Sequence, residues 1–298
     1  MSQAIGKPAT WYALAGSSSR SSGSPLNYRH AFHAGNFADL VKHAALLQLI
    51  AAAASDPAPL RIIDTHAGAG VYDLAGPEAQ RSGEAEAGVG RLLAARDAPA
   101  QFAPLLAAVK RLNGGDRITR YPGSPWLAAE ALRPQDSYLG CELRPSEQAD
   151  LARTLKGRRG AETFCADGFA VAIERCPARG PALVLIDPPF ERADDYAQVV
   201  RTVAAVAQKN PAAQALVWLP LKDLETFDAF LRDLEDAVDA PILAAETRMR
   251  PLTDPMRMNG CALALVGPDR GMEPVLGAIC HWTATTLGEG GSARVYRL

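Results

Sequence analysis

The sequence predicts an α/β protein with a mostly parallel sheet that carries helices on both faces. Short runs of branched apolar residues recur along the chain, and several end in an acidic residue. Segments with helical spacing of apolar residues alternate with these runs. The interval between the first two runs is much longer than the roughly 30 residues usual in such sheets. This interval indicates an inserted segment.

Composition excludes several classes of protein. The 298 residues are 48% hydrophobic and 21% charged, which suffices for a large core. The formal net charge of -2 excludes a polybasic coat, so any nucleic-acid contact must come from a local patch. No apolar run reaches the roughly 18 residues of a membrane span, and the five cysteines include no CxxC pair. We expect a cytoplasmic protein with no structural metal and no membrane contact.

Residues 1–25 are predicted to be a disordered tail. Their Ser- and Gly-rich stretch over 17–25 is poor in apolar residues, and nothing in it has the form of a secretory signal. The composition changes at Leu26, and apolar residues at helical spacing predict a helix over 37–54.

The remaining elements follow in order along the chain. The apolar runs predict buried strands over 60–63, 137–143, 162–167, 181–190 and 213–220. Helices are predicted over 145–155, 169–175, 195–208 and 222–234. Two late strands, 242–247 and 261–266, are expected to form a hairpin around 256–260. We predict a main domain over 26–75 and 121–298 and an inserted helical subdomain over 76–120, with helical pieces near 84–95 and 102–112.

The first motif that carries chemistry is Asp64-Thr65-His66-Ala67-Gly68-Ala69-Gly70, at the end of the first strand. Open α/β sheets bind ligands at this edge, and glycine lets the backbone approach a ligand where a Cβ would clash. The GxGxxG dinucleotide fingerprint is not met, because Asp73 stands where its third glycine would be. A plain tight turn is the alternative, and His66 could instead be a core histidine that caps the strand.

The second and third motifs suit a nucleoside. Glu142 ends the second strand, where a carboxylate can accept hydrogen bonds from ribose hydroxyls. Asp167-Gly168 ends the third strand, where the carboxylate can accept from a purine amino group and the glycine N–H can donate to a ring nitrogen. A solvated strand end and an ordinary Asp-Gly turn are the respective alternatives.

The fourth motif, Asp187-Pro188-Pro189-Phe190, follows the most apolar strand. Two consecutive prolines fix φ and remove two N–H groups, which leaves carbonyl groups available to a ligand. An acid, a rigid carbonyl and an aromatic plane within four residues suit a planar base that bears an exocyclic amine.

In this order, the four motifs resemble those of Rossmann-like S-adenosylmethionine (SAM) methyltransferases that act on exocyclic amines. The DPPF element resembles their (D/N/S)PP(Y/F/W) signature. The likeness to the RlmJ family of 23S rRNA adenine-N6 methyltransferases is closer and runs from Leu26 to the C-terminus. Phe190 departs from it, since the family often has Tyr there, but the stacking plane is kept. The residues that carry this likeness are Tyr28-Arg29-His30, His33-Ala34-Gly35-Asn36, Asp39, Lys42-His43, the 64–70 motif and the segment 121–125.

The resemblance implies the Rossmann-like methyltransferase fold, its inserted helical subdomain and a role for each matching residue. Asp187 would be catalytic, and Tyr28, Lys42, Pro188 and Phe190 would meet the RNA. The partner would be 23S rRNA, protein-free or in an early assembly intermediate, with adenine 2030 as the family's target. We expect a monomer. SAM would contact His43, His66, Ser124, Glu142, Asp167 and Gly168, together with Asp64, Gly68 and Gly70 of the first motif.

Several alternatives stay open at the level of sequence. A guanine-N2 rRNA methyltransferase or a DNA adenine-N6 methyltransferase could share the DPPF element. A non-catalytic SAM- or RNA-binding protein is the third alternative, although the intact Asp187, Gly68 and Gly70 argue against it. Lys42 could be a solvated helix residue. The histidines His30, His33 and His43 could bind a metal, although no Cys or close carboxylate completes a usual ligand set.

Overall fold

The computed structural model describes residues 32–253, 258–268 and 271–298 of the chain. The predicted tail over 1–25 and the candidate residues Tyr28 and His30 lie outside these ranges. Part of the connection predicted around 256–260 also lies outside them.

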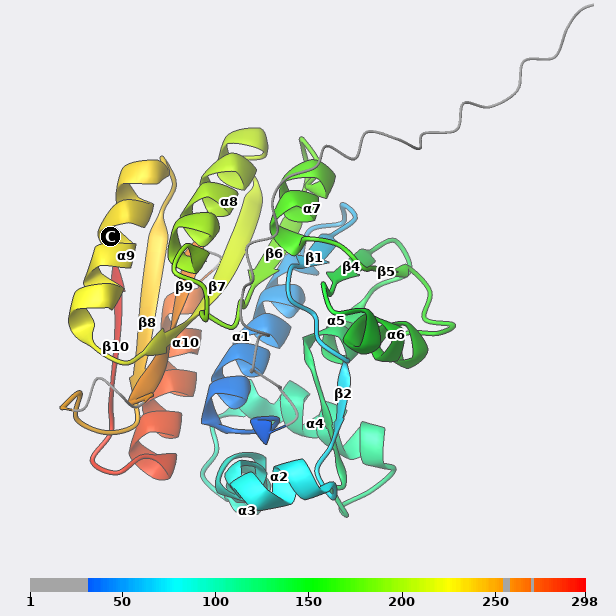
Figure 1. Cartoon of the computed structure of the whole chain (residues 1–298), viewed down its shortest axis with the longest axis vertical. Helices are drawn as coiled ribbons and strands as arrows, with labels where there is room; N and C mark the ends of the chain where they lie inside the picture. The colour runs from blue at the N-terminus through cyan, green and yellow to red at the C-terminus, as the bar shows by residue number, and fades with distance from the viewer. Residues whose placement is uncertain (1–31, 254–257, 269–270) are drawn as a thin grey trace, which may run out of the picture.

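An eight-stranded sheet forms the centre of the molecule, in the order β10-β8-β9-β7-β6-β1-β4-β5 (Figure 1). Its parallel part contains β1 (Arg61–Asp64), β4 (Ser137–Cys141), β5 (Ala161–Phe164), β6 (Ala182–Ile186) and β7 (Ala213–Leu221). The antiparallel pairings involve β8 (Ile242–Arg248), β9 (Gly260–Val266) and β10 (Ser292–Arg297). The predicted α/β class with a mostly parallel sheet is therefore confirmed.

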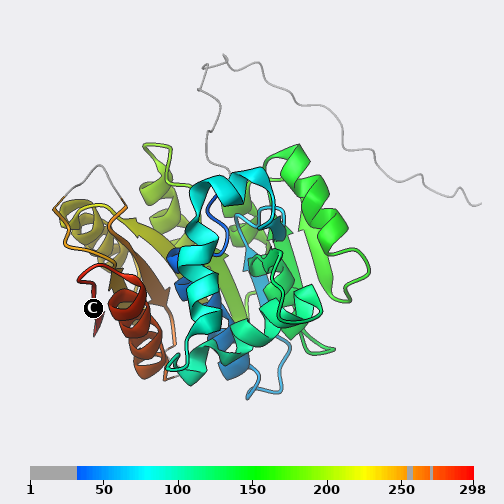
Figure 2. The ribbon, with the colours of Figure 1, turned by 90° about the horizontal axis from the view of Figure 1, so that it is seen from below.

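Helices cover both faces of this sheet (Figure 2). One face carries α1 (Phe37–Ala53), α5 (Ser124–Ala131), α6 (Pro145–Thr154) and α10 (Met272–Trp282). The other carries α7 (Gly168–Arg175), α8 (Asp195–Lys209) and α9 (Leu224–Ala237). Strand β6 shows why its sequence is apolar throughout: Leu183 and Leu185 face the α1 side, whereas Val184 and Ile186 face the α8 side.

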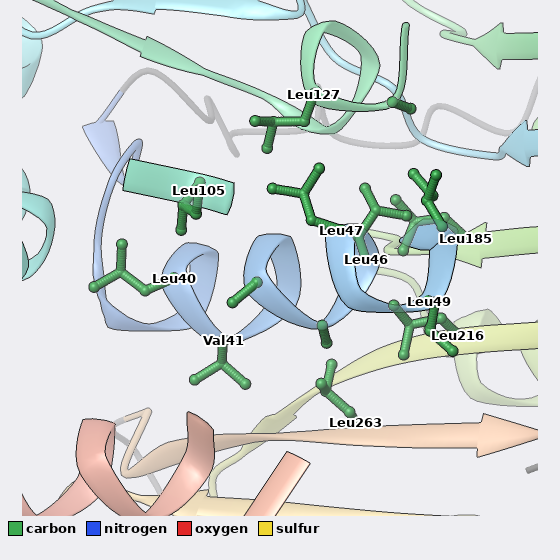
Figure 3. Close-up of a cluster of buried hydrophobic side chains, with 14 of the residues drawn as sticks. Leu40, Val41, Leu46, Leu47, Leu49, Leu105, Leu127, Leu185, Leu216 and Leu263 are labelled. Carbon is green, nitrogen blue, oxygen red and sulfur yellow. The ribbon is translucent and has the colours of Figure 1, made fainter. Parts of the chain in front are cut away.

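Helix α1 is buried along almost its whole length. Its N-cap Asn36 accepts a hydrogen bond from the Asp39 N–H, which fixes where the helix begins. Figure 3 shows its apolar side chains among partners from two other helices and three strands. Because the helix runs through the interior, its polar residues Asp39, Lys42 and His43 are buried as well. The labelled partners in Figure 3 are Leu105 of α4, Leu127 of α5, Leu185 of β6, Leu216 of β7 and Leu263 of β9.

The segment after the first strand contains two short strands and several helices. Strands β2 (Val71–Asp73) and β3 (Arg120–Pro122) pair antiparallel. Leu92 and Phe102 of this segment belong to the same buried cluster as α1, so the segment packs into the main core. In Figure 1 its helices α2 and α3 lie at the bottom, beyond the N-terminal end of α1. The helical elements are α2 (Pro77–Ser82), η2 (Glu86–Gly90), α3 (Arg91–Ala94), η3 (Ala100–Phe102) and α4 (Ala103–Asn113).

The observed elements differ from the sequence prediction at identifiable places. Strand β6 stops at Ile186, because Pro188 and Pro189 cannot donate to a ladder. Helix α9 starts at Leu224, because the Asp223 side chain caps it by accepting from the Thr226 N–H at 2.7 Å. Helices α5 and α10 and the edge strand β10 were not predicted. In the described ranges, no helix combines the length and apolar character needed to cross a membrane.

Candidate active site

A cavity of about 820 Å³ opens where α1 begins and the parallel strands end. It brings together most of the residues that the sequence singled out. Asp64 and Gly70 are not in its lining, and Tyr28 lies outside the described residues. The candidate residues in the lining are Lys42, His43, His66, Gly68, Ser124, Glu142, Asp167, Gly168, Asp187, Pro188 and Phe190.

The ion pair between Lys42 and Asp187 joins α1 to the end of β6. The Lys42 Nζ donates to Asp187 Oδ2 at 2.5 Å and lies 3.1 Å from Asp39 Oδ1. Lys42 is only 5% exposed, so its interpretation as a solvated helix residue is wrong. One buried ammonium therefore lies between two carboxylates in the cavity wall.

Asp39 fixes this arrangement from the first turn of α1. Its carboxylate accepts a hydrogen bond from the Gly35 N–H at 2.9 Å, in addition to the contact with Lys42. His43, one helical position after Lys42, shares a 2.9 Å hydrogen bond with the Tyr121 hydroxyl. Burial raises the pKa of Tyr121 well above its ordinary value, so the phenol stays protonated.

Two of the three histidines considered for a metal, His33 and His43, are described, and each has its own hydrogen-bond partner. His33 Nδ1 lies 3.0 Å from Glu84, and Asn36 Nδ2 donates to the same carboxylate at 2.9 Å. Within the described part of the chain, no cluster of three or more His, Cys, Asp or Glu residues has the arrangement of a metal site.

Phe190 gives the DPPF turn an unusual backbone. Its φ is +50°, in the left-handed region that a bulky residue rarely adopts. The ring packs against Tyr196, with centroids 4.7 Å apart, and lies 6.2 Å from the ring of Trp218. The surrounding aromatic rings thus hold the strained turn in place, as is typical of functional sites.

The opposite part of the cavity contains polar groups suited to a nucleoside. Glu142 accepts from the N–H groups of Gly68 at 3.1 Å and Arg144 at 2.8 Å. The side chain of Leu143, next in the chain, lines the cavity although 60% of its surface is exposed. Desolvation lowers the pKa of His66 to about 4, so its imidazole is neutral at pH 7.

Asp167 and Gly168 combine a helix cap with a close approach of two chain segments. The Asp167 carboxylate accepts from the Phe169 N–H at 2.9 Å at the start of α7. A Cβ on Gly168 would lie 1.9 Å from the Thr65 carbonyl oxygen, so only glycine fits. The ends of β1 and β5 are thereby held together at the floor of the cavity.

Asp64 and Gly70 lie behind the wall and support it. Asp64 Oδ2 accepts from the Ser124 hydroxyl at 2.7 Å and the Tyr138 hydroxyl at 3.0 Å. Its Oδ1 is buried and has no hydrogen-bond partner among the described residues. Burial raises the pKa of Asp64 to about 6. Gly70 has a φ of +83°, and its carbonyl accepts from the Gly123 N–H at 2.8 Å just before α5.

Sequence reasoning missed four residues that build this site. Asp39 was part of the family likeness but received no role, although its position three residues before Lys42 on a helix is a usable signal. Leu143 follows Glu142 at the end of a strand. An apolar residue next to such an acid could have indicated an apolar surface beside the ligand. Trp218 and Glu84 could not be assigned from sequence, because each meets its partners only across long chain separations.

Comparison with known proteins connects the chain to a family of ribosomal RNA methyltransferases. The family model described as ribosomal RNA large subunit methyltransferase D, RlmJ, matches residues 57–297. A protein named ribosomal RNA large subunit methyltransferase J from Haemophilus influenzae is 33% identical over 264 residues, 88% of this chain and 94% of its own length. The protein of the same name from Escherichia coli is 32% identical over 268 residues, 90% of this chain and 96% of its own.

A solved structure shows the same fold over nearly the whole chain. It comes from Legionella pneumophila and superposes with a TM-score of 0.80 at 27% identity. The match covers 89% of this chain and 98% of that one.

Proposed function

Because this chain belongs to the RlmJ family of ribosomal RNA large subunit methyltransferases, we propose that it transfers the methyl group of SAM to N6 of an adenine in 23S rRNA. The observation that carries the proposal is the position of Asp187. Its carboxylate lies in the same cavity as Glu142 and Asp167, paired with a buried lysine and followed by two prolines and an aromatic ring.

The residues at the ends of β4 and β5 fit SAM as the methyl donor. Glu142 and Asp167 offer carboxylates to the ribose and to the adenine amino group, and the exposed Leu143 offers an apolar surface to the adenine ring. His66 is neutral and does not repel a cation. When bound, SAM supplies an electrophilic methyl group on a sulfonium centre.

Asp187 and Pro188 would position the nucleophile. The N6 lone pair of adenine is conjugated with the ring, which makes the amine a poor nucleophile. We propose that the Asp187 carboxylate and the Pro188 carbonyl accept the two N6 hydrogens, so that the lone pair points at the methyl group. Such positioning can supply up to roughly 7–11 kcal/mol of the barrier.

Asp187 would also take up the charge that develops on the amine. Its carboxylate offsets this positive charge and accepts the proton directly or through water, a contribution of about 10²–10⁴-fold. Lys42 fixes the position of the Asp187 carboxylate, while Asp39 holds Lys42 in turn. In this arrangement Lys42 acts on the substrate through the carboxylate.

The target base must leave its stack to reach this cavity. Phe190 would then stack on it, which is worth about 1–3 kcal/mol in single-strand binders. Tyr28 would contact the RNA from the segment before α1. We further propose that the protein acts as a monomer in the cytoplasm, on 23S rRNA that is protein-free or in an early assembly intermediate.

Incubation with labelled SAM and protein-free 23S rRNA, 16S rRNA or DNA tests the proposal. We expect label only on 23S rRNA, and nucleoside mass spectrometry should identify N6-methyladenosine. Asp187→Asn should abolish transfer while SAM still binds. Label on guanine, on 16S rRNA alone or on DNA alone would contradict the proposed function.

A further inference from the structure

Charges of both signs line the cavity along the edge of the sheet, and carboxylates follow β4 and β5 together with Arg144. Glu142 and Asp167 follow β4 and β5 on one half. On the other half Arg192, Lys222 and Arg250 follow β6, β7 and β8. Asp187 lies between the two halves, at the end of β6.

The topology explains why the three cations come to the same edge. Strands β6 and β7 are parallel, and β9 is antiparallel to both β7 and β8. Strand β8 therefore runs in the direction of β7, and the residues that follow all three strands emerge on the same side of the sheet.

These cations remain accessible to a ligand. Lys222 is exposed, and the Arg192 side chain is 60% exposed with Asp194 at 3.2 Å. Arg250 is half-buried, and its Nε is buried without a hydrogen-bond partner among the described residues. Arg250 lines the cavity, so the exposed part of its side chain can meet an anion there.

Acidic groups near Arg192, Lys222 and Arg250 reduce the positive potential of these three side chains only in part. The Asp195 carboxylate is engaged by the Arg192 backbone N–H at 2.9 Å. Glu289 lines the cavity but is exposed, so solvent screens it.

We propose that Arg192, Lys222 and Arg250 bind backbone phosphates of the RNA next to the target nucleotide. This inference rests on the proposed function, because it assigns the partner of the same cavity. The RNA strand then crosses the ends of β6, β7 and β8, and its flipped base reaches Asp187 from that side. Glu142 and Asp167 disfavour phosphate on the other half, which is left for SAM. A chain with a net charge of -2 needs such a local basic surface, because phosphate contacts supply much of the affinity for RNA.

Binding of a fluorescent 23S rRNA fragment, in the presence of S-adenosylhomocysteine, tests this surface without turnover. Lys222→Gln and Arg250→Gln should each raise the dissociation constant for RNA roughly threefold to tenfold at moderate salt. The slope of log affinity against log salt should fall by about 0.7–0.9 for each lost contact. The affinity of both variants for S-adenosylhomocysteine should equal that of the wild type, which shows that the variants are folded.

Arg201→Gln is the matched control. Arg201 is exposed on α8 and lines a separate shallow hollow with Asp233 and Asp236 of α9. It should leave both the RNA affinity and the salt slope unchanged. An unchanged slope in both Lys222→Gln and Arg250→Gln would overturn the inference. So would an equal loss in Arg201→Gln, or a slope loss seen only with DNA of the same sequence. Failure of the proposed function would be seen separately, as wild-type protein that binds RNA with the expected slope but transfers no methyl group to adenine.

Discussion

The buried lysine of α1 joins two carboxylates in the wall of the cavity. Lys42 is held between Asp39 and Asp187. Asp39 and Lys42 belong to α1, whereas Asp187 follows β6. Removing one member of a buried ionic group leaves an uncompensated charge, which typically costs about 3–5 kcal/mol. The same contact fixes the position of the Asp187 carboxylate, which we propose meets the substrate.

Lys42→Met should therefore lower methyl transfer by about 10²-fold or more, because Asp187 loses the group that orients it. The affinity for SAM should change little. Single-turnover transfer and calorimetric titration with S-adenosylhomocysteine measure the two quantities. Lys42→Arg keeps the charge and should retain more activity than Lys42→Met. Full activity in the methionine variant would show that Asp187 does not need the ion pair.

Asp64 gives the stability of the protein a specific dependence on pH. Burial raises its pKa in the folded state from 3.8 to about 6. Folding therefore favours the protonated form, so the favourable contribution is complete below about pH 4 and is lost as the pH rises to about 6. The shift corresponds to about 3 kcal/mol.

Asp64→Asn should remove this dependence, since the amide does not ionise. The free energy of unfolding of the wild type minus that of the variant should decrease between pH 4 and pH 7. Urea denaturation of both proteins at several pH values in that range gives the comparison. Parallel pH profiles would mean that Asp64 is ionised at no extra cost in the folded protein.

At the residue scale, the sequence indicates which groups could act but not how they are held. The acidic residues at the strand ends could be predicted, because parallel strands bring their carboxyl ends to a common edge. The contact between Lys42 and Asp187 could not, because 145 positions separate the two residues. The positive φ of Phe190 also has no sequence signal, since Phe is a poor choice for that region.

At the element scale, contacts between the segment around η2 and the residues that precede α1 form part of the cavity lining. Glu84, just before η2, binds both His33 and Asn36. A Cβ on Gly88 would lie 2.1 Å from the Gly35 carbonyl oxygen, so the two segments touch through their backbones. Residues 84 and 88 are thereby fixed to the segment that leads into α1.

Glu84→Gln should loosen this contact and change the titration of His33. The hydrogen bond with Glu84 raises the pKa of His33, although burial opposes it. The stabilising contribution is present below the unfolded pKa of 6.5 and is lost as the pH rises through the raised value. An NMR titration of the His33 ring should show the raised pKa in the wild type and a lower one in the variant. Equal pKa values in the two proteins would contradict the assignment.

Elements with strong local signals could be predicted from the sequence to within a few residues. The N-cap side chains Asn36, Asp167 and Asp223 mark the starts of α1, α7 and α9. Strands β2 and β3 have three residues each and depend on one another for pairing, so no local pattern reveals them. Strand β10 is an edge strand with a mixed polar sequence, which explains why it was missed.

At the scale of the whole molecule, the described parts form one α/β body with a cavity at the carboxyl edge of its sheet. Such a cavity couples ligand binding to global stability, because a ligand that binds only the folded state stabilises it by about 2.7 kcal/mol at 100 times its dissociation constant. SAM and S-adenosylhomocysteine should therefore raise the melting temperature.

Leu143→Ser should reduce this ligand-induced increase, because it removes the apolar surface beside Glu142. The variant without ligand should melt at the wild-type temperature, since Leu143 is 60% exposed. Leu224→Ser is the matched control, with a leucine that is 38% exposed on α9 and absent from the cavity lining. Thermal unfolding of the three proteins with and without S-adenosylhomocysteine measures the effect. An undiminished increase in Leu143→Ser would exclude Leu143 from the binding surface.

Strand β10 has a practical consequence for the design of shortened forms of the protein. It pairs with the apolar strand β8 at one margin of the sheet, and the Leu298 N–H still donates to the Ile242 carbonyl at 3.0 Å. A form that ended before Ser292 would leave an open ladder of unpaired backbone groups on β8, a template for self-association into insoluble material. Truncations made for crystallisation should therefore keep the last seven residues of the chain, 292–298.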